Sequence, residues 1–146
     1  MSYWDTSCLI KLYTPEPDSA LFRARLAAEI SCLTADIAPL EFWATVRRKE
    51  SEGVLAPGEA ETVFRALVND VASNEITLVN CDAPVRQEFH AIVDQCHAQT
   101  PPIYIRTNDA LHLAAARCSG ETEIVATDKR LREAALLLGF SVFPPP

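Results

Sequence analysis

The sequence carries no excess of basic residues, no long apolar run and no linker that would divide its 146 residues into domains. Lys and Arg number 13 against 20 Asp and Glu, and the net charge of −7 argues against a protein that clamps nucleic acid by bulk positive charge. The strongest apolar run, Ala134–Phe140, is far shorter than the roughly 18 residues of a membrane span. No secretory signal is recognisable, so we expect a single cytoplasmic domain over residues 1–146 with no membrane partner.

Cysteine is present but in no spacing typical of metal binding. The five cysteines are an odd number, contain no Cys-x-x-Cys and each lie in or beside an apolar stretch. We interpret them as buried, reduced thiols. A zinc site made of His90, Cys96 and His97 is an alternative, although its spacing matches no common zinc pattern.

Strand-like and helix-like segments alternate along the chain. Short apolar or β-branched segments predict strands at 2–4, 31–34, 75–80, 123–126 and 140–143. The segments between them predict helices at 8–13, 18–29, 36–52, 58–73, 84–98, 108–118 and 129–138, with Asp36 as the N-cap of the third. This alternation predicts an α/β protein whose mostly parallel sheet has helices on both faces.

Four carboxylates stand where such a fold gathers functional groups. Asp5 and Asp128 each end a predicted strand, and open α/β sheets bind their ligands beyond the carboxyl ends of the strands. Asp109 lies in the first turn of a predicted helix that is apolar nearly all round. Glu41 lies inside another helix, on a stripe at helical spacing that we expect to face inward and that comprises Ile37, Leu40, Glu41 and Ala44. A carboxylate on an apolar stripe needs a cation or strong donors, because burying it alone is costly.

Each acid has a simpler explanation when taken alone. Asp5, Asp109 and Asp128 could be N-caps or first-turn acids favoured by the helix dipole. Glu41 could pair with Arg48 across two turns or point outward. One shared task explains all four together, namely binding a hard divalent cation such as Mg²⁺ or Mn²⁺, which prefers carboxylate oxygens.

The segments around these acids resemble the motifs of PIN domains. Residues 3–12 resemble the family's Asp-Thr-Ser opening followed by an apolar helix, and residues 40–48 resemble its internal glutamate helix. Residues 108–116 closely match its Asp-Ala-Leu-His-Leu-Ala helix, and residues 125–131 are similar to its last acidic motif. The four segments have the family's order and spacing and span nearly the whole chain. Its size and single-domain build look like those of VapC-type toxins of toxin–antitoxin pairs.

The resemblance implies a Rossmann-like three-layer α/β/α sandwich and a Mg²⁺- or Mn²⁺-dependent endoribonuclease. The residues that match the family's catalytic, metal-binding quartet are Asp5, Glu41, Asp109 and Asp128. The resemblance also implies two protein partners, a second copy of the chain and a small antitoxin that blocks the site.

Chemical roles for these residues follow as expectations. Asp5 and Asp109 are the expected main ligands, with Asp128 binding directly or through water. Glu41 would either ligate the ion or act as base for the attacking water. The side chains expected to orient the aspartates or bound waters are Thr6, Ser7, Thr127 and Asn108.

Basic residues flank the acidic motifs. Each has a simple alternative as an ordinary solvated side chain, and the candidate contacts to RNA phosphates are Arg47, Arg48, Lys49, Arg106, Lys129 and Arg130. His112 follows Asp109 by one helical turn, and we interpret it as a packed, hydrogen-bonded core histidine rather than a catalytic base. Phe42 and Trp43 are adjacent and point in different directions, so we expect one in the core and the other available to a partner chain.

Two other functions remain open at this point. A haloacid-dehalogenase-like phosphotransferase also has an aspartate after its first strand, but usually carries a second two residues later, where this chain has Ser7. A non-catalytic PIN-like binding module would keep the fold without the metal chemistry, and the intact quartet speaks against it.

Overall fold

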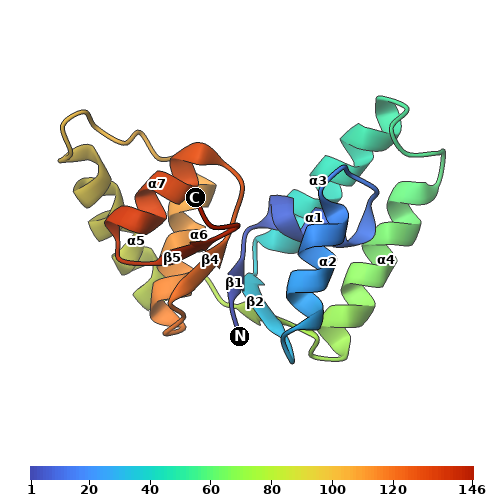
Figure 1. Cartoon of the computed structure of the whole chain (residues 1–146), viewed down its shortest axis with the longest axis horizontal. Coiled ribbons are helices and arrows are strands. Elements are labelled where there is room, and N and C mark those ends of the chain that lie inside the picture. Colours follow the sequence, from blue (N-terminus) through green and yellow to red (C-terminus); the bar gives the residue numbers. More distant parts are fainter.

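A five-stranded parallel sheet lies between two layers of helices in the computed structural model, which describes residues 1–146 (Figure 1). The strands are β1 (Tyr3–Trp4), β2 (Cys32–Ala35), β3 (Ile76–Val79), β4 (Glu123–Val125) and β5 (Ser141–Phe143). Their spatial order is β3-β2-β1-β4-β5, and every neighbouring pair is parallel. The predicted α/β/α sandwich with a parallel central sheet is confirmed.

Seven helices connect the strands. They are α1 (Thr6–Tyr13), α2 (Ser19–Ala27), α3 (Ala38–Ser51), α4 (Glu59–Ala72), α5 (Ala83–His97), α6 (Thr107–Cys118) and α7 (Lys129–Leu137). Every predicted helix and strand is present, and no boundary is displaced by more than two residues. None of the helices combines the length and the apolar character needed to cross a membrane.

The strands supply two hydrophobic cores because successive side chains point to opposite faces of a sheet. Tyr3 packs into the core shared with α5, α6 and α7, whereas Trp4 packs into the core shared with α1 to α4. Figure 1 shows the same division, with α5 to α7 on one side of the sheet and α1 to α4 on the other. Helix α6 contributes a fully buried run, Leu113–Ala116, as its apolar composition predicts. The central strand β1 is therefore buried on both faces, and it ends directly at Asp5.

Asp36 does not cap α3, which corrects the predicted start of that helix. The N-cap position belongs to Ile37, and Pro39 occupies the first turn, where the missing N–H of proline costs no helical hydrogen bond. The Asp36 carboxylate instead accepts a hydrogen bond from the backbone N–H of Cys81, 3.2 Å away. Asp36 thus ties the end of β2 to the segment that follows β3.

The prediction of which face of α3 points inward is wrong: the buried face lies one residue further along the chain than predicted. The buried residues of the helix are Ala38, Phe42 and Val46, whereas Leu40 is 73% exposed and Ala44 also faces solvent. Phe42 sets this face, because its ring packs against Tyr13 of α1 and Phe64 of α4. Glu41 consequently lies at the edge of the buried face rather than within it. Trp43 is 39% exposed, so the expectation that only one of the adjacent aromatic residues lies in the core is confirmed.

The cysteines are all free, but they are not all buried. Cys8, Cys32 and Cys96 lie in the cores and Cys81 is partly buried, whereas Cys118 is exposed. The prediction of buried thiols is therefore wrong for Cys118, which is the last residue of α6 and lies where that helix emerges from the core. His90, Cys96 and His97 form no metal-binding group.

Candidate active site

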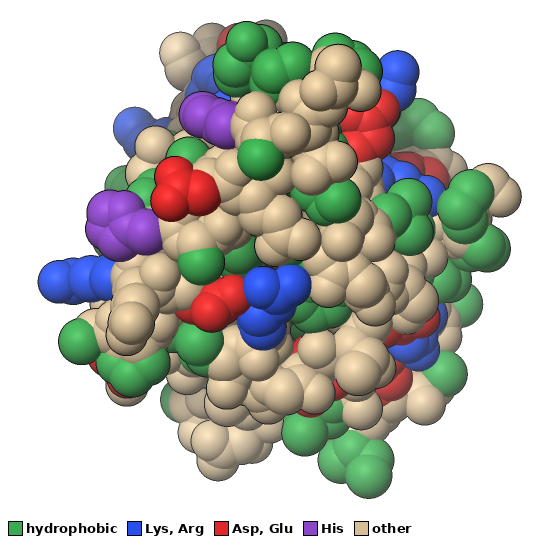
Figure 2. Space-filling view, turned by 90° about the vertical axis from the view of Figure 1, so that its left-hand side faces the viewer, with side chains coloured by type: hydrophobic (Ala, Val, Ile, Leu, Met, Phe, Trp, Pro, Cys, Tyr) green, Lys and Arg blue, Asp and Glu red, His purple; other side chains and the backbone are tan.

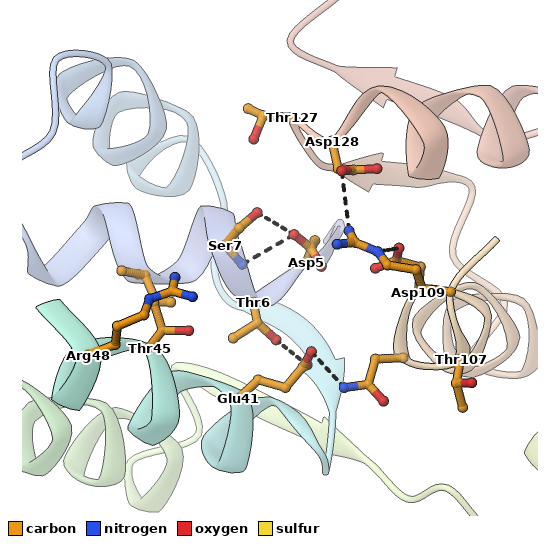
Figure 3. Close-up of a pocket in the computed structure, with 13 residues that line it drawn as sticks. Asp5, Thr6, Ser7, Glu41, Thr45, Arg48, Thr107, Asp109, Thr127 and Asp128 are labelled. Atoms are coloured by element: carbon orange, nitrogen blue, oxygen red, sulfur yellow. Dashed lines mark hydrogen bonds and ion pairs between the residues drawn. The ribbon is translucent and has the colours of Figure 1, made fainter. Parts of the chain in front are cut away.

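One polar cavity of about 660 Å³ opens at the carboxyl ends of β1 and β4. All four predicted carboxylates line it, although they lie at the N-termini of four separate helices (Figure 3). Asp5 and Asp128 are the N-caps of α1 and α7, and Glu41 and Asp109 lie in the first turns of α3 and α6. Since the N-terminal end of a helix dipole is positive, four helix ends stabilise negative charge in this cavity. Only one of the 13 lining residues is hydrophobic.

Asp5 and Asp128 combine capping with exposure to the cavity. Asp5 accepts hydrogen bonds from the backbone N–H of Ser7 at 3.2 Å and from the Ser7 hydroxyl through the same oxygen, Oδ2. Asp128 Oδ1 accepts from the N–H of Leu131 at 2.9 Å. Capping and a role in a shared site are therefore compatible, because each cap uses one carboxylate oxygen and leaves the other for the cavity.

Glu41 is held by hydrogen bonds on both oxygens. Its Oε1 accepts from the Thr6 hydroxyl at 2.7 Å and lies 2.7 Å from His112 Nε2, while its Oε2 accepts from Asn108 Nδ2 at 3.1 Å. Burial alone would raise the pKa of Glu41, but the hydrogen bond and charge of His112 outweigh it and lower the pKa. Glu41 is consequently an ionised carboxylate at neutral pH.

His112 is buried, and its second ring nitrogen is also paired. Nδ1 lies 2.9 Å from the Tyr3 hydroxyl, so the imidazole bridges the central strand and Glu41. Burial lowers the pKa of His112, but the contact with Glu41 and the nearby charge of Asp5 leave it above its ordinary value. The prediction of a packed, hydrogen-bonded histidine is confirmed. The sequence did not predict that its partner would be Glu41. The i, i+4 spacing of Asn108 and His112 is the sequence signal for this contact, whereas nothing in the sequence indicated Tyr3.

Arg106 bridges the remaining two acids. Its Nε donates to Asp109 Oδ2 at 2.8 Å, and its Nη2 donates to Asp128 Oδ2 at 3.2 Å. Burial raises the pKa of Asp109, and the neighbouring negative charges of Asp5 and Asp128 raise it further. Arg106 lowers it, but by less, so the pKa of Asp109 lies above its usual value. A cation bound beside Asp109 would therefore stabilise the ionised form of its carboxyl group.

The predicted supporting and basic residues divide into those that face the cavity and those that do not. The cavity wall includes Thr6, Ser7, Asn108, Thr127, Arg48 and Arg106, together with Ile10, Thr45 and Thr107, which were not predicted. Lys129 and Arg130 line an adjoining cavity of about 380 Å³ that shares Arg106 and Asp128 with the first.

Arg47 and Lys49 lie outside both cavities, unlike Arg48 between them. The Arg47 guanidinium stacks on Trp43 and pairs with Glu50 at 2.9 Å, and Lys49 pairs with Glu16 at 3.2 Å. Adjacent residues of a helix point about 100° apart, so only Arg48 of the three reaches the cavity. On the side of the molecule formed by α5 and α7, Figure 2 shows blue and red side chains interspersed rather than one continuous basic patch.

The chemistry of the cavity fits a divalent metal ion. Carboxylates and hydroxyls are the oxygen donors that Mg²⁺ and Mn²⁺ prefer, and the Arg106 guanidinium already stands between two of the carboxylates as a cation. In the present arrangement, no three His, Cys, Asp or Glu side chains converge closely enough to hold one ion. Mg²⁺ usually takes only one or two carboxylates and keeps several waters, so two acids of the cavity together with bound waters would suffice to hold it.

Comparison with known proteins gives the family. Residues 2–137 match the family model for the PIN domain. The chain belongs to the PIN domain family. This PIN domain is 28% identical over 151 aligned residues to Ribonuclease VapC35 of Mycobacterium tuberculosis, in both strain CDC 1551 / Oshkosh and strain H37Rv. The alignment covers 99% of this chain and 97% of each relative.

The fold is shared with a solved structure, that of FitAcB from Neisseria gonorrhoeae. The TM-score is 0.64 at 19% sequence identity, and the match covers 99% of this PIN domain and 98% of the other chain. The resemblance seen in the four sequence segments is therefore confirmed at the level of family and fold.

Proposed function

We propose that this PIN domain, a single domain over residues 1–146, is a Mg²⁺- or Mn²⁺-dependent endoribonuclease that hydrolyses RNA phosphodiester bonds. The observation that carries the proposal is the convergence of four carboxylates, each at a helix N-terminus, on one polar cavity. The similarity to proteins named Ribonuclease VapC35 supports it.

Asp5 and Asp109 are the proposed direct metal ligands, because they are the least exposed of the four acids at 7% each. Asp128 would bind directly or through water, and Glu41 is a further possible ligand. A bound divalent ion supplies positive charge at the phosphate and lowers the pKa of a bound water. Ser7 and Thr127 line the cavity beside Asp5 and Asp128 and would orient carboxylates or waters there.

Glu41 is the proposed proton acceptor for the attacking water if it does not itself bind the ion. His112 and Thr6 occupy its Oε1, which fixes the direction of the carboxylate. Its Oε2 bonds only to the exposed Asn108 and is the oxygen that can receive a proton. The lowered pKa keeps Glu41 ionised at neutral pH, as an acceptor must be.

Phosphate binding is assigned to the basic side chains at the two cavities. Arg48 and Arg106 line the larger cavity, and Lys129 and Arg130 line the adjoining one. Their charges act locally, so the overall net charge of −7 does not prevent RNA from binding at this edge of the sheet.

We further propose that the protein is the toxin of a toxin–antitoxin pair, acting in the cytoplasm as a homodimer and inhibited by a small cognate antitoxin. The support is the similarity to VapC-type proteins over nearly the whole chain. Leu40 and Trp43 also leave apolar surface exposed on α3, which a protein partner would cover.

The test is cleavage of total cellular RNA by the purified, antitoxin-free protein with Mg²⁺, Mn²⁺ or EDTA. The wild type should cleave with an ion and not with EDTA, and Asp5→Asn should lose at least about 100-fold in rate, the scale of a lost catalytic group. Asn is also a good N-cap, so this change spares α1. Asp94→Asn is the matched control, because Asp94 is exposed on α5 and lines neither cavity. Equal cleavage by wild type and Asp5→Asn would refute the proposal. An inactive wild type that still bound a protein partner tightly would favour the non-catalytic binding module.

A further inference from the structure

The Arg106 guanidinium lies between the carboxylates of Asp109 and Asp128 and pairs with both. We infer that Arg106 is a displaceable counter-ion: it bonds Asp109 and Asp128 in the metal-free protein, leaves them when a divalent cation binds, and then contacts the RNA phosphate. This inference rests on the proposed function and adds a role for a residue of the chain itself.

The negative charges of the cavity are balanced by different partners. Glu41 has His112 as its partner, and Asp5 has the N-terminal end of α1 with the Ser7 donors. Asp109 and Asp128 share one cationic partner, the Arg106 guanidinium, at 2.8 and 3.2 Å, and Asp128 also accepts from the backbone N–H of Leu131. Arg106 is therefore the one cation that holds two of the proposed ligand residues, and a metal ion at those oxygens competes with it directly.

Arg106 can leave its two carboxylate partners without disturbing the fold. Its side chain is 62% exposed, and it sits at the N-cap position of α6, where its side chain makes no capping hydrogen bond. A long exposed side chain changes rotamer on a time scale of nanoseconds or less. Asp109, by contrast, is fixed in the first turn of α6 with its residue almost fully buried. Displacement therefore moves the guanidinium and leaves the acids in place.

The released guanidinium lies beside a second group of basic side chains. Arg106 and Asp128 form the wall between the two cavities, and the smaller one carries Lys129 and Arg130. A guanidinium released from Asp109 and Asp128 remains within reach of both cavities. It is then free to bind a phosphate, to which its planar donors are well suited. Metal binding and phosphate binding are thereby coupled through one side chain.

The test is Mn²⁺ titration calorimetry on wild type, Arg106→Ala and Arg106→Gln, with Arg130→Ala as the control. Arg130 lines the adjoining cavity and donates to the carbonyl of Tyr104 at 3.0 Å, but it pairs with no carboxylate. Its removal therefore subtracts one nearby positive charge without breaking an ion pair. Both Arg106 variants should bind Mn²⁺ roughly three- to tenfold more tightly than wild type, the effect of losing one or two partly exposed ion pairs. Arg130→Ala should tighten binding by less than about twofold.

A second readout addresses the phosphate contact. The Arg106 variants should raise the KM for RNA at saturating Mn²⁺ more than they lower kcat, because substrate binding is what they lose. Mn²⁺ binding to the Arg106 variants that is no tighter than to Arg130→Ala would overturn the counter-ion role. Tighter binding with an unchanged KM would overturn the phosphate contact. Failure of the wild type to bind Mn²⁺ at all would instead overturn the proposed function, and this inference with it.

Discussion

Nε2 of His112 and Oε1 of Glu41 lie 2.7 Å apart, although 71 positions separate the two residues in the chain. The imidazole is held from behind by the Tyr3 hydroxyl, and the Tyr3 and His112 rings pack edge to face. A line of hydrogen bonds thus runs from the most buried strand of the sheet to a carboxylate at the cavity. The orientation of Glu41 is set by the core rather than by a flexible loop.

Removing the Tyr3 hydroxyl should disturb this line with almost no change in shape. Tyr3→Phe leaves a buried ring nitrogen of His112 unpaired, which should lower the free energy of unfolding by about 1–3 kcal/mol in urea titrations. Because His112 is then held less firmly against Glu41, kcat for RNA cleavage should fall while KM is unchanged. Tyr104→Phe is the matched control, since Tyr104 is exposed. Wild-type stability and kcat in Tyr3→Phe would contradict the account.

Two substitutions at Asp128 should separate its capping role from its role in the cavity. Asp128→Asn keeps a good N-cap for α7 and should have nearly wild-type stability, whereas Asp128→Ala should lose about 1 kcal/mol. Both variants should lose RNA cleavage to a similar degree, because both remove the carboxylate charge. Thermal unfolding and cleavage rates measured on the same preparations check this. If Asp128→Asn cleaves RNA as the wild type does, Asp128 is only a helix cap.

Thiol labelling should identify one fast cysteine. Cys118 is exposed, while Cys8, Cys32 and Cys96 are buried. Cys81 is partly buried, and burial together with Asp36 raises the pKa of its thiol to about 12, so it should react slowly at pH 8. An aromatic disulfide reagent at pH 8 should therefore label Cys118 within minutes in the native protein, and the buried thiols only on unfolding. Cys118→Ser should remove the fast phase and leave the others unchanged. Fast labelling of several thiols in Cys118→Ser would show that the cores open far more readily than their packing implies.

Stability should decline in alkaline solution. Burial raises the pKa of Cys8 and of Cys32 from the ordinary 9.0 to about 12. Above pH 9 the unfolded chain releases these protons while the folded protein retains them, so each thiol favours unfolding increasingly as pH rises towards the folded pKa. The expected loss is about 1.4 kcal/mol per thiol for each pH unit between about 9 and 12, with no loss from these groups below pH 8. Cys8→Ala should flatten the profile of unfolding free energy against pH, and an unchanged slope in that variant would contradict this assignment.

The sequence was sufficient to predict the order of strands and helices, because periodicity and turn residues act locally. It also indicated Asp5 and Asp128, since the ends of parallel strands meet at one edge of a sheet. Asp109 and Glu41 lie inside helices, and it was a shared metal-binding task and the resemblance to PIN domain motifs that joined them to the other two. The buried face of α3 could not be predicted, because contacts of Phe42 with Tyr13 and Phe64 decide the rotation of that helix. The contact between Tyr3 and His112 joins residues 109 positions apart and leaves no local pattern.

The basic residues illustrate the same limit. The sequence gives no reason to distinguish Arg47, Arg48 and Lys49. In the structure Arg47 and Lys49 form ion pairs with glutamates outside the cavity, and only Arg48 lines the cavity. The bridge from Arg106 to Asp128 spans 22 positions and depends on how α6 and α7 meet. Charge type is a local property of the chain, whereas pairing is a property of the assembled fold.

The central claim is that the four carboxylates form one metal site, and Mn²⁺ titration calorimetry on the antitoxin-free protein tests it most directly. The wild type should show saturable Mn²⁺ binding, and the Asp5→Asn/Asp109→Asn double variant should show none while unfolding cooperatively as the wild type does. Binding of equal affinity to both proteins, or none to the wild type even with RNA added, would mean that these acids are helix caps and surface groups.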